Sequence, residues 1–336
     1  MGPLESQVNK DMQYTMFVVD ETPYCFWGWD LQEKNIAFLN YINPKYFEYI
    51  AQVHFENLET DNKYNAAISL RTSYFHGIET LFTLLCAALQ SPHCVFGWIQ
   101  KCKSEQLRNM VKKINLYDKN VFNKIGLEDV TWETISNNIN LFAYDSIERL
   151  QETRESFAHL WQRFAHDFLN DKNIKEYNSI KHGFRMKPGG FSIMVGEEKE
   201  YCIAVPEEDM KLIGGSEFGT SFFIVEKVRG LENEKNSPHF FPKLHSINWN
   251  PMSLSHSLNL ISISINNIIS FLKIINGVDP KSVQFTRPQD KEYFKEPWKR
   301  PVGIVSFSLD HEIYKEQIHK FTKKEIFDGL KIKTTK

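Results

Sequence analysis

Residues 64–90, YNAAISLRTSYFHGIETLFTLLCAALQ, carry the clearest periodic pattern in the chain. Their apolar side chains recur at alternating spacings of four and three, which places them on one face of a helix. Arg71 is the charged member of that stripe. Asp61 or Asn62 can cap the start of the helix, and Pro92 ends the pattern. We therefore predict a long helix from about residue 62 to residue 90.

Further helices follow from the same periodicity, at residues 44–58, 144–169, 174–182 and 251–276. Asn250 and Pro251 suit the cap and first position of the last of these, and Gly277 ends it. This helix carries no formal charge from residue 252 to residue 272. A solvent-facing helix normally carries Lys or Glu, so we expect both sides to be covered. The cover is either the rest of the chain, which we favour, or a second copy.

The composition changes after Gly183. Strands are predicted at residues 184–187, 191–195, 201–205 and 221–228, which are rich in β-branched and aromatic residues. Residues 229–246 are expected to form a loop. Shorter strands are predicted at residues 14–19, 283–285 and 303–307, and a helix from Asp310 toward Lys320. The fold class is thus α+β, with a mainly helical region, 1–183, and an antiparallel β-region, 184–336. The long helix 251–276 belongs to the second region, and if it packs back onto the helical region the two form one folded unit.

The composition of the 336-residue chain excludes several classes of protein. It has 40 basic and 42 acidic side chains and is 42% hydrophobic, which excludes a disordered chain and a strongly basic nucleic-acid clamp. The net charge is near zero because a basic segment and an acidic segment offset each other. Residues 100–124 hold seven basic and two acidic side chains, whereas residues 125–171 hold nine acidic and three basic ones. These segments are either two faces that attract each other or a nucleic-acid-facing patch followed by an acidic face.

The cysteines and the N-terminus predict a cytoplasmic protein without a metal. No organic cofactor is expected either, because the sequence has no phosphate-binding glycine loop or dinucleotide fingerprint. Five cysteines are too few and uneven for a disulfide framework. Cys86, Cys94 and Cys102 recur every eight residues, but the close cysteine pair of a zinc site is missing. The N-terminal residues do not resemble a secretory signal, and the apolar segments 78–89 and 258–275 are too short or too interrupted to cross a membrane.

Two Arg-x₄-His pairs are the first candidates for a chemical site: Arg71 with His76, and Arg154 with His159. Arginine can bind a phosphate in a bidentate manner, and histidine can act as a general acid or base. A separation of five residues places the two side chains about 140° apart on a helix, so other elements must complete the site. The alternative is that both arginines lie at the edge of the core and are neutralised by nearby acids.

A second candidate lies where the helices give way to strands. Asn178 and His182 are four residues apart and share a helix face, with Lys181 and Arg185 beside them. His182 would transfer a proton and a cation would stabilise negative charge on a phosphodiester. A polar cap at the negative end of the helix explains the same residues.

Long helices with an Arg-x₄₋₆-His motif and an Asn-x-x-Lys-His segment resemble the HEPN superfamily over about residues 64–183. The resemblance implies a helical domain of prokaryotic toxins and phage-defence proteins, many of them dimeric, metal-independent ribonucleases. It also implies that Arg154 and His159, or Arg71 and His76, are the motif pair, with Asn178 and His182 as the variant form. The catalytic candidates are thus Arg154, His159, Asn178, Lys181 and His182. Substrate binding would fall to the other candidates, which are Arg71, His76 and Arg185. The residue after the motif arginine, often Asn in that superfamily, is Thr72 or Glu155 here.

Two functions are therefore expected. The first is an RNA-cleaving or RNA-binding protein of a bacterial stress or phage-defence system. The second is a non-catalytic interaction module that forms a homodimer or binds a protein partner through the helix 251–276.

Overall fold

A computed structural model describes residues 13–143 and 147–331 of the chain. The chain forms two compact units: Met1–Ile174 with Pro251–Arg300, and Lys175–Asn250 with Pro301–Lys336. Helices dominate the first unit and antiparallel strands the second, with the long helix at residue 251 returning to the first. The predicted α+β class is confirmed.

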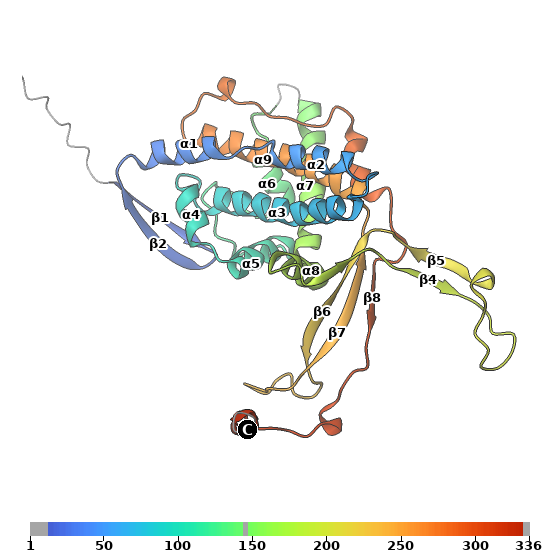
Figure 1. The fold of residues 1–336 in the computed structure, drawn as a ribbon. Helices are drawn as coiled ribbons and strands as arrows, with labels where there is room; N and C mark the ends of the chain where they lie inside the picture. Colours follow the sequence, from blue (N-terminus) through green and yellow to red (C-terminus); the bar gives the residue numbers. More distant parts are fainter. Residues whose placement is uncertain (1–12, 144–146, 332–336) are drawn as a thin grey trace, which may run out of the picture. The chain divides into compact units, whose positions relative to one another are not determined.

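The first unit contains one β-hairpin and most of the helices (Figure 1). Its elements are β1 (Gln13–Val19), β2 (Thr22–Gly28), α1 (Leu31–Tyr41), α2 (Tyr46–Glu56), α3 (Lys63–Gln90), α4 (Val95–Lys101), α5 (Ser104–Asn115), α6 (Trp132–Ile139), α7 (Ile147–Leu169), α9 (Pro251–Ile275) and the 3₁₀ helices η2 (Pro280–Ser282) and η3 (Lys291–Trp298). Helix α8 (Asp171–Lys181) begins in this unit and continues into the second. Residues 144–146, included in a predicted helix, lie outside the described residues.

Helices α3 and α9 lie side by side, and α2 contacts both (Figure 1). Gly77 makes the contact between α3 and α9 close, because a Cβ at this position would stand 3.1 Å from Cγ2 of Ile261. The stripe predicted in α3 is buried from Ile68 to Leu89, Arg71 included. The helices predicted at 62–90 and 251–276 are confirmed almost to the residue.

The uncharged polar side chains of α9 are satisfied inside the first unit. Ser264 accepts a hydrogen bond from Trp161 Nε1 at 3.0 Å. Asn267 donates to the carbonyl oxygen of Thr286 at 2.9 Å and accepts from its amide at 2.8 Å. By length and hydropathy α9 would be apolar enough to cross a membrane, as would α3 with α4 if they were one broken span, but 67% of the α9 window is buried inside the protein. The chain itself covers α9 on both sides.

A buried glutamine at the end of α3 hydrogen-bonds to the β1–β2 turn. Gln90 accepts a hydrogen bond from the Asp20 amide at 2.9 Å and donates to the Asp20 carbonyl at 3.1 Å. Its Oε1 also accepts from Trp98 Nε1 at 3.1 Å. Asp20 has φ of 55°, a left-handed conformation that Asp tolerates. Its carboxylate then pairs with Lys113 Nζ at 2.7 Å.

The second unit is built on the antiparallel sheet β3–β6–β7–β8. Its elements are β3 (Met186–Pro188), β4 (Ser192–Val195), η1 (Glu207–Asp209), β5 (Lys211–Gly215), β6 (Gly219–Lys227), β7 (Phe240–Asn248), β8 (Ser306–Leu309), η4 (Lys315–Gln317) and α10 (Lys323–Lys331). Buried Glu176 of α8 fixes the sheet, since it accepts hydrogen bonds from Thr220 Oγ1 at 2.5 Å and Trp249 Nε1 at 2.9 Å. Strands β4 and β5 form a separate hairpin.

Strand β7 corrects the prediction of a loop at residues 229–246. Pro242 and the neighbouring histidines made this segment resemble a loop. The ladder between β7 and β8 covers only residues 244–247, so Pro242 lies where that edge of β7 has no paired strand. A proline is tolerated there because no ladder hydrogen bond is lost.

Other short predictions were wrong, chiefly near the C-terminus. No strand forms at residues 201–205 or 283–285. Asp310 does not cap a helix, because its carboxylate accepts a hydrogen bond from the Leu244 amide at 2.8 Å. The following segment packs Ile313 and Ile318 on a small core, which consists of Val228, Leu231 and Phe241. A helix forms later, as α10.

We predict that Gln90→Leu lowers the free energy of unfolding by roughly 3 kcal/mol or more, because it leaves the amide and carbonyl of Asp20 and the Trp98 indole N–H without this buried partner. Urea denaturation measures the change. Gln52→Leu is the control, since Gln52 is exposed and bonds only to Glu56 in the described structure. If Gln90→Leu lowers the free energy of unfolding by no more than about 0.5 kcal/mol, the range of surface substitutions, the hydrogen bonds of Gln90 do not stabilise the turn.

Candidate functional site

The candidate site lies on the exposed face of α7. Phe157, Trp161 and Phe164 turn into the core, whereas His159 and Arg163 are exposed on another face. His159 and Arg163 are four residues apart, so their side chains lie one turn apart on the same side of the helix. Both line a pocket of about 480 Å³ between α7 and η3.

Aromatic contacts hold η3 against α7 and form the wall of the pocket. The Phe294 ring meets Phe157 edge-on at 5.1 Å between centroids, and Trp298 lies 6.0 Å from Phe164. The Arg163 guanidinium stands 4.5 Å from the centroid of the Trp298 ring, within the range of a cation–π contact. The pocket therefore combines the partly buried Trp298 indole with the Arg163 guanidinium, which lies over its ring.

The other cations of the pocket belong to surface ion pairs. Lys291 Nζ lies 3.2 Å from Glu152, and Lys295 Nζ lies 2.7 Å from Glu292. Such exposed pairs are weak, so an anionic ligand can compete for either lysine. Neither His159 nor Arg163 has a carboxylate within ion-pair distance among the residues that the structure describes.

Arg154 does not line this pocket. Its carbonyl accepts a hydrogen bond from Ser136 Oγ of α6 at 2.7 Å. Burial lowers the pKa of its guanidinium, and Nε finds no acceptor among the described residues. Arg154 and His159 are thus on different sides of α7, as their spacing of five requires, and the structure does not bring this predicted pair together in the pocket.

Arg71 lies in a buried polar cluster at the junction of α7 and α8. It donates to Asn173 Oδ1 at 3.1 Å, and its guanidinium lies 4.5 Å from the Phe75 ring centroid. Tyr74 donates to Asp167 Oδ2 at 2.5 Å. Asn173 in turn donates to the Asp167 carbonyl at 3.2 Å. These contacts connect α3 to the end of α7, so Arg71 has a structural role.

His76, the predicted partner of Arg71, lies elsewhere. It is exposed, packs edge-on against Phe47 at 5.4 Å, and lines a cavity of about 360 Å³ with Glu79 and Cys102. Burial raises the pKa of the Cys102 thiol to about 12, so this cysteine is protonated at neutral pH and is not a nucleophile there.

The candidates at the end of α8 belong to the second unit. Asn178, Lys181, His182 and Arg185 are all exposed. The chain turns out of the helix at Gly183, where φ is 107°. The ammonium group of Lys181 lies 5.5 Å from the Tyr177 ring centroid. This arrangement fits the polar helix cap that the sequence left open as an alternative.

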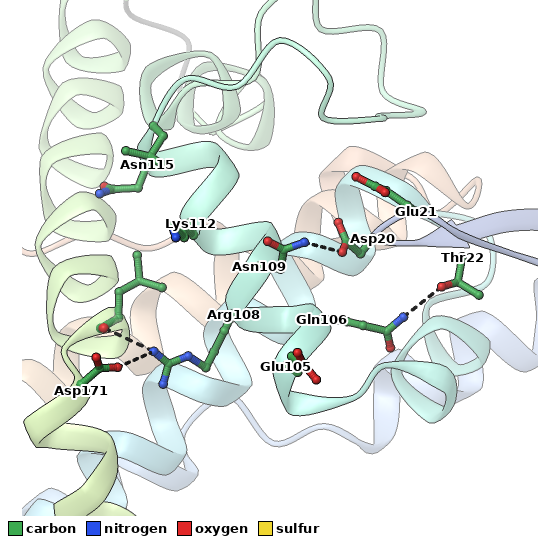
Figure 2. A pocket seen from close by; sticks show the side chains of 12 residues that line it. Asp20, Glu21, Thr22, Glu105, Gln106, Arg108, Asn109, Lys112, Asn115 and Asp171 are labelled. Atoms are coloured by element: carbon green, nitrogen blue, oxygen red, sulfur yellow. Dashed lines mark hydrogen bonds and ion pairs between the residues drawn. The ribbon is translucent and has the colours of Figure 1, made fainter. Parts of the chain in front are cut away.

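A larger groove of about 830 Å³ lies between the β1–β2 turn, α5 and the start of α8 (Figure 2). Its polar side chains mostly bind one another: Arg108 pairs with Asp171 at 3.2 Å, and Asn109 donates to Asp20 at 2.6 Å. The basic segment 100–124 is therefore neutralised in part by the β1–β2 turn and in part by Asp171. Because most of these groups already have partners, the groove is less suited to a charged ligand.

The sequence analysis missed Arg163 and the residues of η3. The spacing of His159 and Arg163 was a usable signal. The η3 residues were hidden because more than a hundred residues separate them from α7. Within the described ranges, no group of three or more His, Cys, Asp or Glu side chains is placed to hold a metal ion.

Comparison with protein-family models, curated proteins and solved structures finds no significant match to this chain. The interpretation of the site therefore rests on its geometry.

The pH dependence of stability tests the buried cluster. Burial raises the pKa of Asp167 above its ordinary 3.8, although the Tyr74 hydrogen bond and the charges of Arg71 and His166 act in the opposite direction. The folded state therefore binds this proton more tightly than the unfolded chain. This group makes the free energy of unfolding fall as the pH rises from about 4 through the folded-state pKa.

We predict that Asp167→Asn removes this decrease, because the amide oxygen still accepts from Tyr74 but carries no titrating proton. Tyr74→Phe should extend the decrease to higher pH, since it removes a bond that favours the ionised carboxylate. Urea denaturation between about pH 4 and pH 8 measures both. An identical slope in wild type and Asp167→Asn would refute the assignment.

Proposed function

We propose that the pocket between α7 and η3 binds RNA, with His159 as a proton-transfer group and Arg163 as a phosphate ligand. The observation that carries the proposal is the placement of these two side chains one turn apart in one pocket, without a carboxylate partner among the described residues.

The chemistry of the pocket supports RNA over other anions. Arg163 offers a guanidinium that binds phosphate oxygens in a bidentate manner. Phe294 and Trp298 line the pocket beside Arg163, so an unpaired base could stack on Trp298 once the Arg163 guanidinium turns from that ring to a phosphate, and base stacking on aromatic rings is how single strands are commonly bound. Lys291 and Lys295 can exchange their weak surface pairs for the phosphates on either side.

Cleavage in this pocket would need no metal. The ribose 2′-hydroxyl would attack the adjacent phosphorus, His159 would accept the hydroxyl proton, and Arg163 would stabilise the added negative charge. The 5′-oxygen would leave as a hydroxyl by taking the proton that His159 had accepted, which restores the neutral imidazole, and a 2′,3′-cyclic phosphate would remain on the other product. The resemblance to the HEPN superfamily supports the same reaction class. Our proposal moves the cationic role from Arg154 to Arg163.

The experiment measures binding and cleavage of a labelled single-stranded RNA in the presence of EDTA. We expect His159→Ala to abolish cleavage and to change affinity little, because a proton-transfer group contributes mainly to the transition state. We expect Arg163→Gln to weaken binding by about tenfold or more and to reduce its salt dependence, since one phosphate contact is lost.

Matched controls separate this pocket from the other candidates. His166→Ala removes another exposed histidine of α7, and Lys112→Gln removes a cation from the groove of Figure 2. Both should behave as wild type. His182→Ala tests the end of α8 in the same assay. Loss of cleavage in His182→Ala alone would transfer the reaction to α8, and absence of RNA binding by the wild type would exclude the function.

A further inference from the structure

The sheet of the second unit has two very different faces. Residues of β6 and β7 alternate in burial: Phe222, His245 and Ile247 on the inner face are almost completely buried. The inner face also carries Thr220, whose hydroxyl bonds to Glu176 of α8. This face is therefore already covered.

The outer face is apolar and exposed. The register places Phe223 opposite Leu244 and Leu244 opposite Leu309, so three apolar side chains form one row across β6, β7 and β8. Phe223 and Val225 are each 68% exposed and Leu309 is 59% exposed. The remaining apolar members of this face are Phe240, Pro242, Val305 and Phe307.

The outer face carries almost no charge on these three strands. Between the apolar rows lie Ser221 and Ser246, which hydrogen-bond to each other at 2.7 Å. Among the described residues of β6, β7 and β8, Lys227 is the one charged side chain on this face, and it lies at the far end of β6. On the neighbouring strand β3, exposed Lys187 pairs with Ser221 and so lies on the same face, at its edge. An uncharged centre can meet an identical surface without like-charge repulsion, which a two-fold interface requires.

Among the described residues of the second unit, a ring contact covers this face at its β8 edge, where Phe191 lies 6.0 Å from Phe307 between centroids, and the row through Phe223 is left uncovered. Helix α10 has an apolar stripe of its own, but Ile326, Phe327 and Leu330 are all exposed, so α10 does not cover the sheet. The segment before α10 is bound beside the turn that joins β6 to β7, where the Phe321 amide donates to His239 Nε2 at 3.0 Å. Monomeric proteins rarely expose contiguous apolar patches larger than a few hundred Å².

We infer that the outer face of β6, β7 and β8 is a homodimer interface, on which the same face of a second copy packs. Two apolar sheet faces pack about 10 Å apart with interdigitating side chains, as in a β-sandwich. The row of Phe223, Leu244 and Leu309 would form the centre of the interface. This inference does not rest on the proposed RNA binding, because the pocket between α7 and η3 lies in the other unit.

Sedimentation velocity over roughly 1 to 100 µM protein, the range in which an interface of modest size equilibrates, tests the inference on RNase-treated full-length chain. We expect wild type to reach the mass of a dimer. Phe223→Glu and Leu309→Glu should each weaken dimerisation at least tenfold, because each places two like charges in the centre. Both residues are exposed in the monomer, so the circular dichroism spectrum should stay unchanged, and the thermal midpoint should match that of wild type diluted until it is monomeric.

Leu212→Glu is the matched control, since Leu212 is also 59% exposed but lies on the separate β4–β5 hairpin. It should remain dimeric, and so should Arg163→Gln, whose defect is expected only in RNA binding. A wild type that is monomeric throughout would overturn the inference. So would dimers that persist in a Phe223→Glu, Leu309→Glu double variant. In a monomeric wild type, a disulfide between Phe223→Cys and Phe327→Cys would show that α10 of the same chain is the occupant.

Discussion

The contact between α3 and α9 organises the first unit. Gly77 removes the side chain that would hold the two helices apart, and Ile261 fills the space it leaves. Helix α9 also contacts α1, α2, α6 and η3, while α3 contacts α4, α5 and α7. The pair therefore reaches most of the other helices, although 160 residues lie between Gln90 at the end of α3 and Pro251 at the start of α9. Their association buries apolar area that neither helix could bury alone, which is the main stabilising contribution available to such a unit.

The same contact requires every polar atom on α9 to find a partner. Ser264 and Asn267 on α9, and Asn276 directly after it, are buried. Ser264 donates to the Leu260 carbonyl one turn earlier, and Asn267 and Asn276 donate to the carbonyls of Thr286 and Pro92. An unpaired buried amide costs several times what a paired one contributes, so these bonds fix the register of α9 against its neighbours. They also fix the segment that follows α9, and through it the position of η3 beside α7.

The candidate pocket is a consequence of that arrangement. His159 and Arg163 are placed by the helical repeat of α7, which the sequence alone predicts. The wall formed by Phe294 and Trp298 exists only because α9 returns the chain to α7. The predicted pairs Arg71 with His76 and Arg154 with His159 each share a helix, but a spacing of five residues turns them to different sides. Sequence proximity was therefore a poor guide, and the four-residue spacing of His159 and Arg163 was a better one.

Local patterns of apolar and charged residues were enough to predict the α+β class, the long helices α3, α7 and α9, and the burial of α9, because periodicity and the absence of charge can be read within a single segment. The sequence also placed β6 and the turn at Gly183. It did not determine β7, because Pro242 is acceptable only where the neighbouring strand has ended, and that depends on the short length of β8. Nor did it determine which face of the sheet stays bare or which cations find carboxylate partners. Those features depend on contacts between residues far apart in the chain, and the periodicity of a single segment carries no information about them.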